Sequence, residues 1–99
     1  MPRVWFITGC SRGLGLALCK LVLDAGESVA ATARWSESLQ HLLDHYGPER
    51  VLTLDLDVND PSQATEAAQA AKDKFGSIDV LVNNAGYAEV TAIEDSTVQ

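Results

Sequence analysis

The sequence predicts an α/β fold, a three-layer arrangement in which a parallel sheet lies between helices on both faces. Short apolar runs, typical of strands buried on both faces, alternate along the chain with amphipathic segments of helical period. The connections are short, and elements that alternate in this way join through right-handed crossovers into one parallel sheet. We therefore expect a partial sheet of about four strands in the spatial order 3-2-1-4, roughly half of a doubly wound sheet.

Four segments are the expected strands. Residues 4–8 form a compact apolar run without alternation, which indicates a strand with both faces buried. Residues 28–33 form a second short strand rich in small residues, and residues 51–56 and 78–82 are the third and fourth. With a helix between each successive pair, the element order is βαβαβαβ.

The first expected helix follows a glycine-rich loop at residues 9–15 and ends at Gly26, a residue type that commonly closes helices. Its apolar residues recur at helical spacing, so they are expected to face the sheet. These residues are Leu14, Leu18, Leu21, Val22 and Ala25.

The second expected helix begins with Ser36 as its N-cap and stops at Gly47-Pro48. His41 and His45 share one face of it, a spacing that metal-binding helices use. Leucine rather than glutamate follows His41 and no third ligand is evident, so we expect a solvated helix face and no metal site. The apolar face is expected to consist of Leu39, Leu42, Leu43 and Tyr46.

The third expected helix has a strong start signal at Asp60-Pro61, a capping side chain followed by proline at the first helical position. Gln63 stands where its side chain can complete a capping box. Gly76 ends the helix. The stripe expected to face the sheet consists of Ala64, Ala67, Ala68, Ala71 and Phe75.

Composition indicates a single-domain globular chain. The 99 residues are 46% hydrophobic and 21% charged, an ordinary balance for a folded domain, and we expect residues 1–99 to form one partial domain. The net charge of −7 disfavours binding to a nucleic-acid backbone. No stretch approaches the roughly 20 apolar residues that cross a bilayer, and the apolar start is too short for a signal peptide. Neither nucleic acid nor membrane is an expected partner.

The chain has two cysteines, Cys10 and Cys19. They lack CxxC spacing and no Cys/His cluster surrounds them, so neither a disulfide framework nor a metal centre is expected. Reduced thiols fit an intracellular setting, and we expect a cytoplasmic location.

A glycine-rich loop joins the first expected strand to the first expected helix. It reads Thr8-Gly9-Cys10-Ser11-Arg12-Gly13-Leu14-Gly15. Glycines here let the chain turn tightly and let backbone N–H groups approach a pyrophosphate, to which the helix N-terminus adds partial positive charge. The spacing is GxxxGxG rather than the commoner GxGxxG. The glycines could serve only the turn, but their position between a strand and a helix favours a phosphate site.

Three motifs follow three successive strands along the chain. They are Thr8-Gly9-x-x-x-Gly13-x-Gly15, Asp57-Val58 after the third strand and Asn83-Asn84-Ala85-Gly86 after the fourth. In this order they resemble the motifs of short-chain dehydrogenases/reductases, and the resemblance covers the chain from Val4 to at least Gly86. It implies a Rossmann-type NAD(P)-binding domain.

For the glycine-rich loop, the resemblance implies contacts with the phosphates and the adenosine ribose of the cofactor, and Leu14 would act through its backbone N–H. The loop residues concerned are Gly9, Ser11, Arg12, Gly13, Leu14 and Gly15.

For the ends of the later strands, the resemblance implies contacts with adenine and the riboses. Asp57 would accept a hydrogen bond from the adenine amino group, and Val58 would offer its backbone N–H to the ring. Asn84, Ala85 and Gly86 would border the riboses. Asn84 would also tie the fourth strand to the end of the first.

The segment after the second strand bears on the choice between NADP and NAD. An NAD-selective protein usually has an acid there to hold the ribose 2′-hydroxyl, but residues 28–35 contain no acid, and Arg34 stands in its place. A guanidinium binds a 2′-phosphate through charge-assisted hydrogen bonds, and Arg12 could complete the clamp. NADP(H) is therefore the expected cofactor and NAD the less favoured one. The alternative is that both arginines are merely solvent-exposed.

The resemblance implies hydride transfer between NADP(H) and a small-molecule carbonyl or secondary alcohol, with a Tyr-x-x-x-Lys pair beside the substrate oxygen. This pair is absent, since Tyr46 is followed four positions on by Arg50 and Tyr87 by Thr91. No catalytic residue is assigned within residues 1–99, and the expected function is that of the N-terminal cofactor-binding part of an oxidoreductase. A stand-alone, non-catalytic nucleotide-binding module and a structural remnant stay open as alternatives.

A sheet that ends after its fourth strand leaves that strand as an exposed parallel edge. Exposed apolar edges recruit other chains. We therefore expect the isolated 99-residue chain to self-associate.

Overall fold

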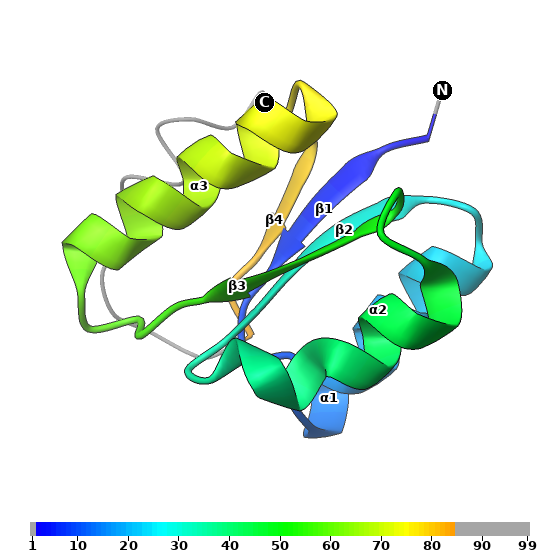
Figure 1. Cartoon of the computed structure of the whole chain (residues 1–99), viewed down its shortest axis with the longest axis horizontal. Coiled ribbons are helices and arrows are strands. Elements are labelled where there is room, and N and C mark those ends of the chain that lie inside the picture. Colours follow the sequence, from blue (N-terminus) through cyan, green and yellow to red (C-terminus); the bar gives the residue numbers. More distant parts are fainter. Residues whose placement is uncertain (1, 85–99) are drawn as a thin grey trace.

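The sheet of this protein has the predicted strand order. The structure, a computed structural model, describes residues 2–84. Within that range the sheet has four strands in the order β3-β2-β1-β4, which confirms the expected 3-2-1-4 (Figure 1). All strand pairs are parallel, so the carboxyl ends of the strands meet at one end of the sheet. The strands are β1 (Val4–Ile7), β2 (Ser28–Ala33), β3 (Val51–Asp55) and β4 (Val80–Val82).

Helices cover both faces of the sheet, as predicted (Figure 1). One face carries α1 (Gly13–Asp24) and α2 (Gln40–Tyr46), with the 3₁₀ turn η1 (Ser36–Leu39) directly before α2, and the other carries α3 (Pro61–Phe75).

Two neighbouring residues of β1 explain why the first strand shows no alternation. Ile7 packs in the core beneath α1 and α2, Phe6 packs in the core beneath α3, and both are fully buried. Successive strand residues point to opposite faces, and both faces of this strand are covered by helices. Burial of each side chain contributes about 1.5–3 kcal/mol to the stability of the fold.

The predicted apolar face of α1 is only partly correct, since Val22 is buried and Leu18 packs against the core but other predicted positions are exposed. Leu14 is 81% exposed and Leu21 is 68% exposed, whereas the buried positions of the helix are Gly15, Cys19, Val22 and Leu23. These four positions also follow the helical period, but the first of them is a glycine, which an apolar pattern does not reveal. The rotation of α1 is set by the close approach of Gly15 to the preceding loop rather than by the burial of leucines.

The predicted N-cap of the second helix is also wrong. Trp35 precedes η1 and no side chain caps that turn or α2. The backbone N–H of Ser36 instead donates to Asp55 Oδ1 at 2.8 Å. The expected apolar positions Leu39 and Leu42 are buried, because they pack against β2 and β3.

The start of α3 confirms one sequence prediction and contradicts another. Asp60 Oδ1 accepts from the backbone N–H groups of Ser62 at 3.0 Å and Gln63 at 3.4 Å, as an N-cap should. The pKa of Asp60 is lowered, chiefly by the hydrogen bond from the Ser62 hydroxyl. The backbone N–H groups of Gln63 and Ser62 lower it further. The expected capping box is absent, since Gln63 Oε1 accepts from the backbone N–H of Asp57 at 2.6 Å. The buried face of α3 consists, as predicted, of Ala64, Ala67, Ala68 and Ala71.

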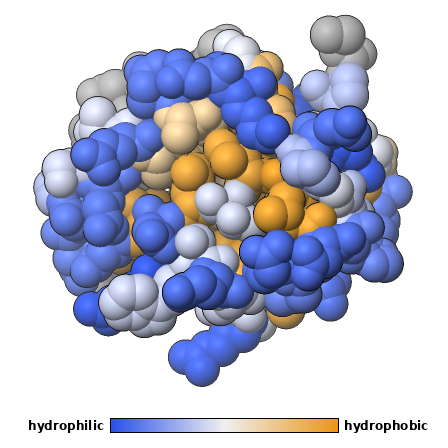
Figure 2. All heavy atoms as spheres, viewed as in Figure 1, coloured by the Kyte–Doolittle hydropathy of each residue, from blue (hydrophilic) through white to orange (hydrophobic). Residues whose placement is uncertain are grey.

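The surface around the edge strand β3 is partly apolar. Figure 2 shows hydrophobic side chains gathered between α3 and α2, with hydrophilic side chains around them. On β3 itself, Leu52 and Leu54 are half-buried. Among residues 2–84, no helix combines the length and the apolar content that crossing a membrane requires.

Candidate functional site

The loop after β1 is fastened to both neighbouring strands at the carboxyl end of the sheet. The Thr8 backbone N–H donates to Val82 O at 3.0 Å, and the Cys10 N–H donates to Thr32 O at 2.9 Å. Gly9 and Gly13 adopt φ values of 67° and 65°, in the left-handed region that favours glycine. The backbone therefore makes a tight turn between β1 and α1, and the N-terminus of α1 opens toward this end of the sheet.

Gly15 has a different role, because it makes room for a close contact. A Cβ atom at this position would collide with the carbonyl oxygen of Gly9 and would lie 2.7 Å from Asn84 Nδ2. Asn84 Nδ2 donates to that same Gly9 oxygen at 3.0 Å. Asn84 thus ties the chain after β4 to the loop after β1, as expected, and Asn83 Oδ1 accepts from Thr8 Oγ1 at 3.1 Å beside it.

A pocket of about 240 Å³ lies next to the loop, at the carboxyl ends of β2 and β3. It brings together four of the predicted site residues, Gly9, Arg34, Asp57 and Val58. Ser11, Arg12 and Leu14 are exposed on the loop and do not line this pocket. Ala85 and Gly86 lie outside the described residues.

Arg34 and Asp57 face each other across the pocket. Arg34 Nη2 lies 3.8 Å from Asp57 Oδ2, and the two side chains are 72% and 35% exposed. Exposed pairs of this kind contribute only about 0.2–1 kcal/mol. The Arg34 guanidinium can therefore leave Asp57 for an anionic ligand at little cost.

Sequence reasoning missed three wall residues of this pocket, Ala33, Leu56 and Asn59. The Asn59 backbone N–H donates to Asp57 Oδ1 at 3.0 Å, a local Asx turn. The succession of Asp57 and Asn59 is the signal that could have indicated this turn.

Asp55, for which the sequence suggests no role, holds the segment that follows Arg34. It accepts from the Ser36 N–H, and hydrogen bonds from the Ser36 backbone and side chain lower the pKa of Asp55. The turn that carries Arg34 is therefore anchored to the end of β3.

Cys10 and Cys19 are free, fully buried thiols that pack the loop against α1. Cys10 Sγ donates to Ile7 O at 3.1 Å, and Cys19 Sγ lies 3.2 Å from Cys10 Sγ. The hydrogen bond to Cys10, together with burial, raises the pKa of Cys19 far above its usual range. Cys19 stays protonated, which is typical of a structural thiol.

His41, His45 and Tyr46 do not line this pocket but lie in a separate groove between α1 and α2. The Tyr46 hydroxyl donates to Asp24 Oδ1 at 2.8 Å, and this hydrogen bond is the main cause that raises the pKa of Tyr46. Among residues 2–84, no group of three or more His, Cys, Asp or Glu side chains is placed to hold a metal ion.

A parallel sheet of this order, whose first strand passes through a glycine-rich loop into a helix, defines a Rossmann-type α/β domain. The chain belongs to the short-chain dehydrogenase family, since the family model described as short chain dehydrogenase matches residues 3–99. Membership of this family implies a nicotinamide dinucleotide as cofactor.

Similar proteins include oxidoreductases from fungi and bacteria. The chain is 52% identical over 95 residues to "Oxidoreductase BOA17" of Botryotinia fuckeliana, covering 96% of this chain and 35% of that protein. A short-chain dehydrogenase crystal structure from Streptomyces avermitilis has a TM-score of 0.81 and 40% identity, over 86% of this chain and 31% of that one. A 3-ketoacyl-(acyl-carrier-protein) reductase from Brucella melitensis, complexed with NADH, has a TM-score of 0.74 and 26% identity, over 80% and 32%. The chain spans about a third of the length of these proteins.

Proposed function

We propose that residues 1–99 are the N-terminal, NADP(H)-binding part of a single dinucleotide-binding domain in an oxidoreductase. The complete protein transfers hydride between NADP(H) and a small-molecule carbonyl or secondary alcohol. The observation that carries the choice of NADP(H) is the position of Arg34. It follows β2 and lines the pocket, and within residues 2–84 its guanidinium forms one ion pair, the exposed contact with Asp57.

The loop fits the phosphates of such a cofactor. Positive φ values at Gly9 and Gly13 form the tight turn, and the missing side chain at Gly15 lets α1 approach the loop, so an anion bound there would meet the N-terminus of α1. Arg12 and Arg34 are the proposed ligands of the 2′-phosphate. The full set of proposed cofactor contacts is Gly9, Ser11, Arg12, Gly13, Leu14, Gly15, Arg34, Asp57, Val58, Asn84, Ala85 and Gly86.

The residues of this chain would bind and orient the dinucleotide, whose nicotinamide ring would supply or accept the hydride. Asp57 and Val58 would hold the adenine ring of the dinucleotide, and Asn84 would contact a ribose. We propose that the serine and the Tyr-x-x-x-Lys segment that handle the substrate proton lie outside residues 1–99. The much greater length of the similar proteins supports this division.

NAD is the second candidate cofactor, because the similar Brucella melitensis reductase is complexed with NADH. The test is to titrate the complete protein with NADPH and NADH and to follow tryptophan fluorescence, for which the exposed Trp35 beside Arg34 is a suitable reporter. We expect NADPH to bind about tenfold or more tightly than NADH. Equal constants, or tighter binding of NADH, would reject the proposed selectivity.

Activity separates the oxidoreductase from the non-catalytic alternatives. The complete protein should oxidise NADPH in the presence of a panel of aldehydes and ketones, with the decrease in nicotinamide absorbance as the measurement. A protein that binds NADPH saturably but turns over none of them would instead be a binding module, and one that binds no dinucleotide would be a structural remnant.

We further propose that the isolated 99-residue chain self-associates through its sheet edges. Among residues 2–84, β4 pairs with β1 alone and β3 with β2 alone, and β3 carries a partly apolar surface (Figure 2). Sedimentation velocity of the isolated chain should show dimers or larger species, whereas a stable monomer would contradict this.

The two free, buried thiols support a reducing compartment such as the cytoplasm as the location.

A further inference from the structure

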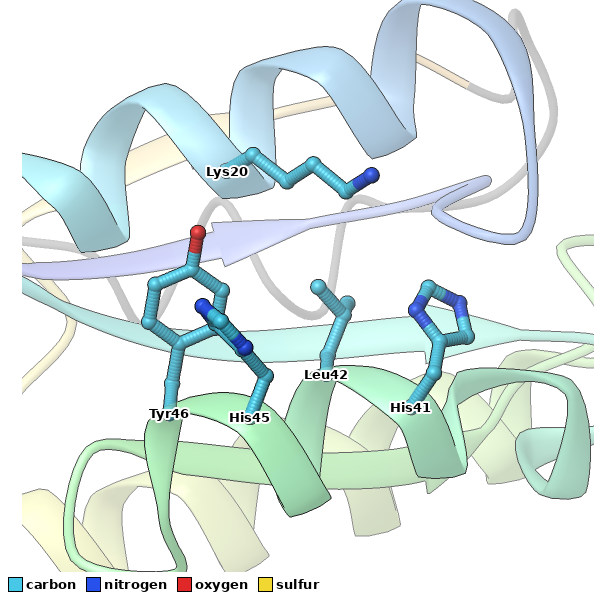
Figure 3. Close-up of a pocket in the computed structure, with 5 residues that line it drawn as sticks. All are labelled: Lys20, His41, Leu42, His45 and Tyr46. Atoms are coloured by element: carbon cyan, nitrogen blue, oxygen red, sulfur yellow. The ribbon is translucent and has the colours of Figure 1, made fainter.

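A second pocket lies between α1 and α2, outside the proposed dinucleotide site. Its volume is about 380 Å³, within the range of small-molecule pockets. Figure 3 shows its lining: Lys20 extends from α1 along the groove, while His41, Leu42 and His45 point up toward it from α2. Leu42 is buried and forms the apolar floor.

The basic side chains of this groove have no charged partner. Among residues 2–84, Lys20 and His41 form no hydrogen bond or ion pair, and His45 makes only an edge-on ring contact with Tyr46. By contrast, Arg3 is paired with Glu27 at 3.3 Å. The chain has a net charge of −7, yet no carboxylate within residues 2–84 forms an ion pair with these basic side chains.

Two acids on the helices that form the groove accept hydrogen bonds from side chains of α2, one of which, Tyr46, lines the groove itself. Asp24 of α1 accepts from the Tyr46 hydroxyl at 2.8 Å, and Asp44 of α2 accepts from its neighbour Gln40 at 2.9 Å. Glu37 of η1 precedes His41 by one turn without forming an ion pair with it. The groove therefore presents hydrogen-bond donors from the Lys20 ammonium group and from the imidazole rings of His41 and His45.

We propose that the groove binds a doubly charged tetrahedral oxyanion, either free or as the phosphoryl group of a small metabolite. Lys20 supplies the fixed charge, and the imidazole rings of His41 and His45 donate from the opposite wall. Arg50 adds no further donor, because its guanidinium donates to the carbonyl groups of Leu23 and Glu27.

The test uses sulfate, a doubly charged tetrahedral anion, and the complete protein saturated with NADPH so that the loop site is filled. The reporters are the ring NMR signals of His41 and His45, identified by their loss in His41→Asn and His45→Asn. We expect saturable shifts of both signals, with a dissociation constant in the millimolar range.

Lys20→Gln should abolish the saturable shifts. Lys74→Gln, an exposed lysine on α3 across the sheet, should leave them unchanged. The proposal is overturned if the signals do not saturate, or if Lys20→Gln and Lys74→Gln behave alike. Because the reporters lie in the groove, the outcome does not depend on which dinucleotide the protein prefers.

A second arm distinguishes the two sources of the anion. Glucose 6-phosphate and inorganic phosphate are titrated at the same pH in the same assay. Tighter binding of the sugar phosphate supports an organic phosphate that also contacts Leu42, and equal binding supports the free anion. If neither shifts the two histidine signals, the proposal is overturned.

Discussion

Gly15→Ala is expected to abolish dinucleotide binding and to lower the free energy of unfolding by about 3 kcal/mol. The added Cβ would collide with the Gly9 carbonyl oxygen, a backbone atom that cannot rotate away, and would also approach Asn84 Nδ2 to 2.7 Å. Relief requires α1 to move away from the loop. That movement would break the hydrogen bond from Asn84 to Gly9 and displace the N–H groups that are proposed to hold the phosphates.

The measurement combines urea unfolding with NADPH titration of the complete protein. Gly26→Ala is the matched control, since Gly26 has φ of 90° at the far end of α1 and open space where a Cβ would lie. It should cost about 1–2 kcal/mol of backbone strain and leave the dissociation constant unchanged. If Gly15→Ala binds NADPH as tightly as Gly26→Ala does, the contact between α1 and Gly9 has no part in binding.

Sequence reasoning succeeded where one local signal decided the structure. Asp60-Pro61 capped α3 as predicted, because an aspartate followed by proline satisfies the first N–H groups of a helix without tertiary help. The strand order likewise follows from the alternation of strands and helices and from the handedness of crossovers. Both features can therefore be predicted from the sequence alone, the helix start from two adjacent residues and the strand order from the succession of elements.

Prediction failed where a long-range contact overrode a local pattern. The leucines at positions 14 and 21 have helical spacing, but α1 is oriented by the approach of Gly15 to Gly9, and a glycine adds nothing to an apolar stripe. Likewise, Gln63 Oε1 accepts a hydrogen bond from the Asp57 N–H and does not complete the predicted capping box. For the site, the sequence indicated Arg34 and Asp57 separately, but their ion pair depends on the pairing of β2 with β3.

Arg34→Ala is expected to raise the dissociation constant of NADPH by about ten- to a hundredfold, the range of charge-assisted hydrogen bonds of about 1.5–3 kcal/mol. The constant for NADH should change by less than about threefold, since NADH has no 2′-phosphate for the guanidinium to bind. The selectivity would then be nearly lost rather than reversed. A protein that prefers NADH also needs a carboxylate after β2 for the ribose hydroxyl groups, and alanine does not supply one.

Arg3→Ala is the control for this experiment. Arg3 is also an exposed arginine paired with a carboxylate, Glu27 at 3.3 Å, but it lies just before β1, at the opposite end of the sheet from the pocket. Arg3→Ala should leave the dissociation constants of NADPH and NADH unchanged. That result would show that removing an exposed positive charge does not by itself weaken NADPH binding. If wild type and Arg34→Ala bind NADPH with comparable constants, Arg34 does not hold the 2′-phosphate and the argument for NADP(H) fails. Loss of affinity for both dinucleotides in equal measure would instead indicate that Arg34 supports the adenosine pocket, through Asp57, without distinguishing the two cofactors.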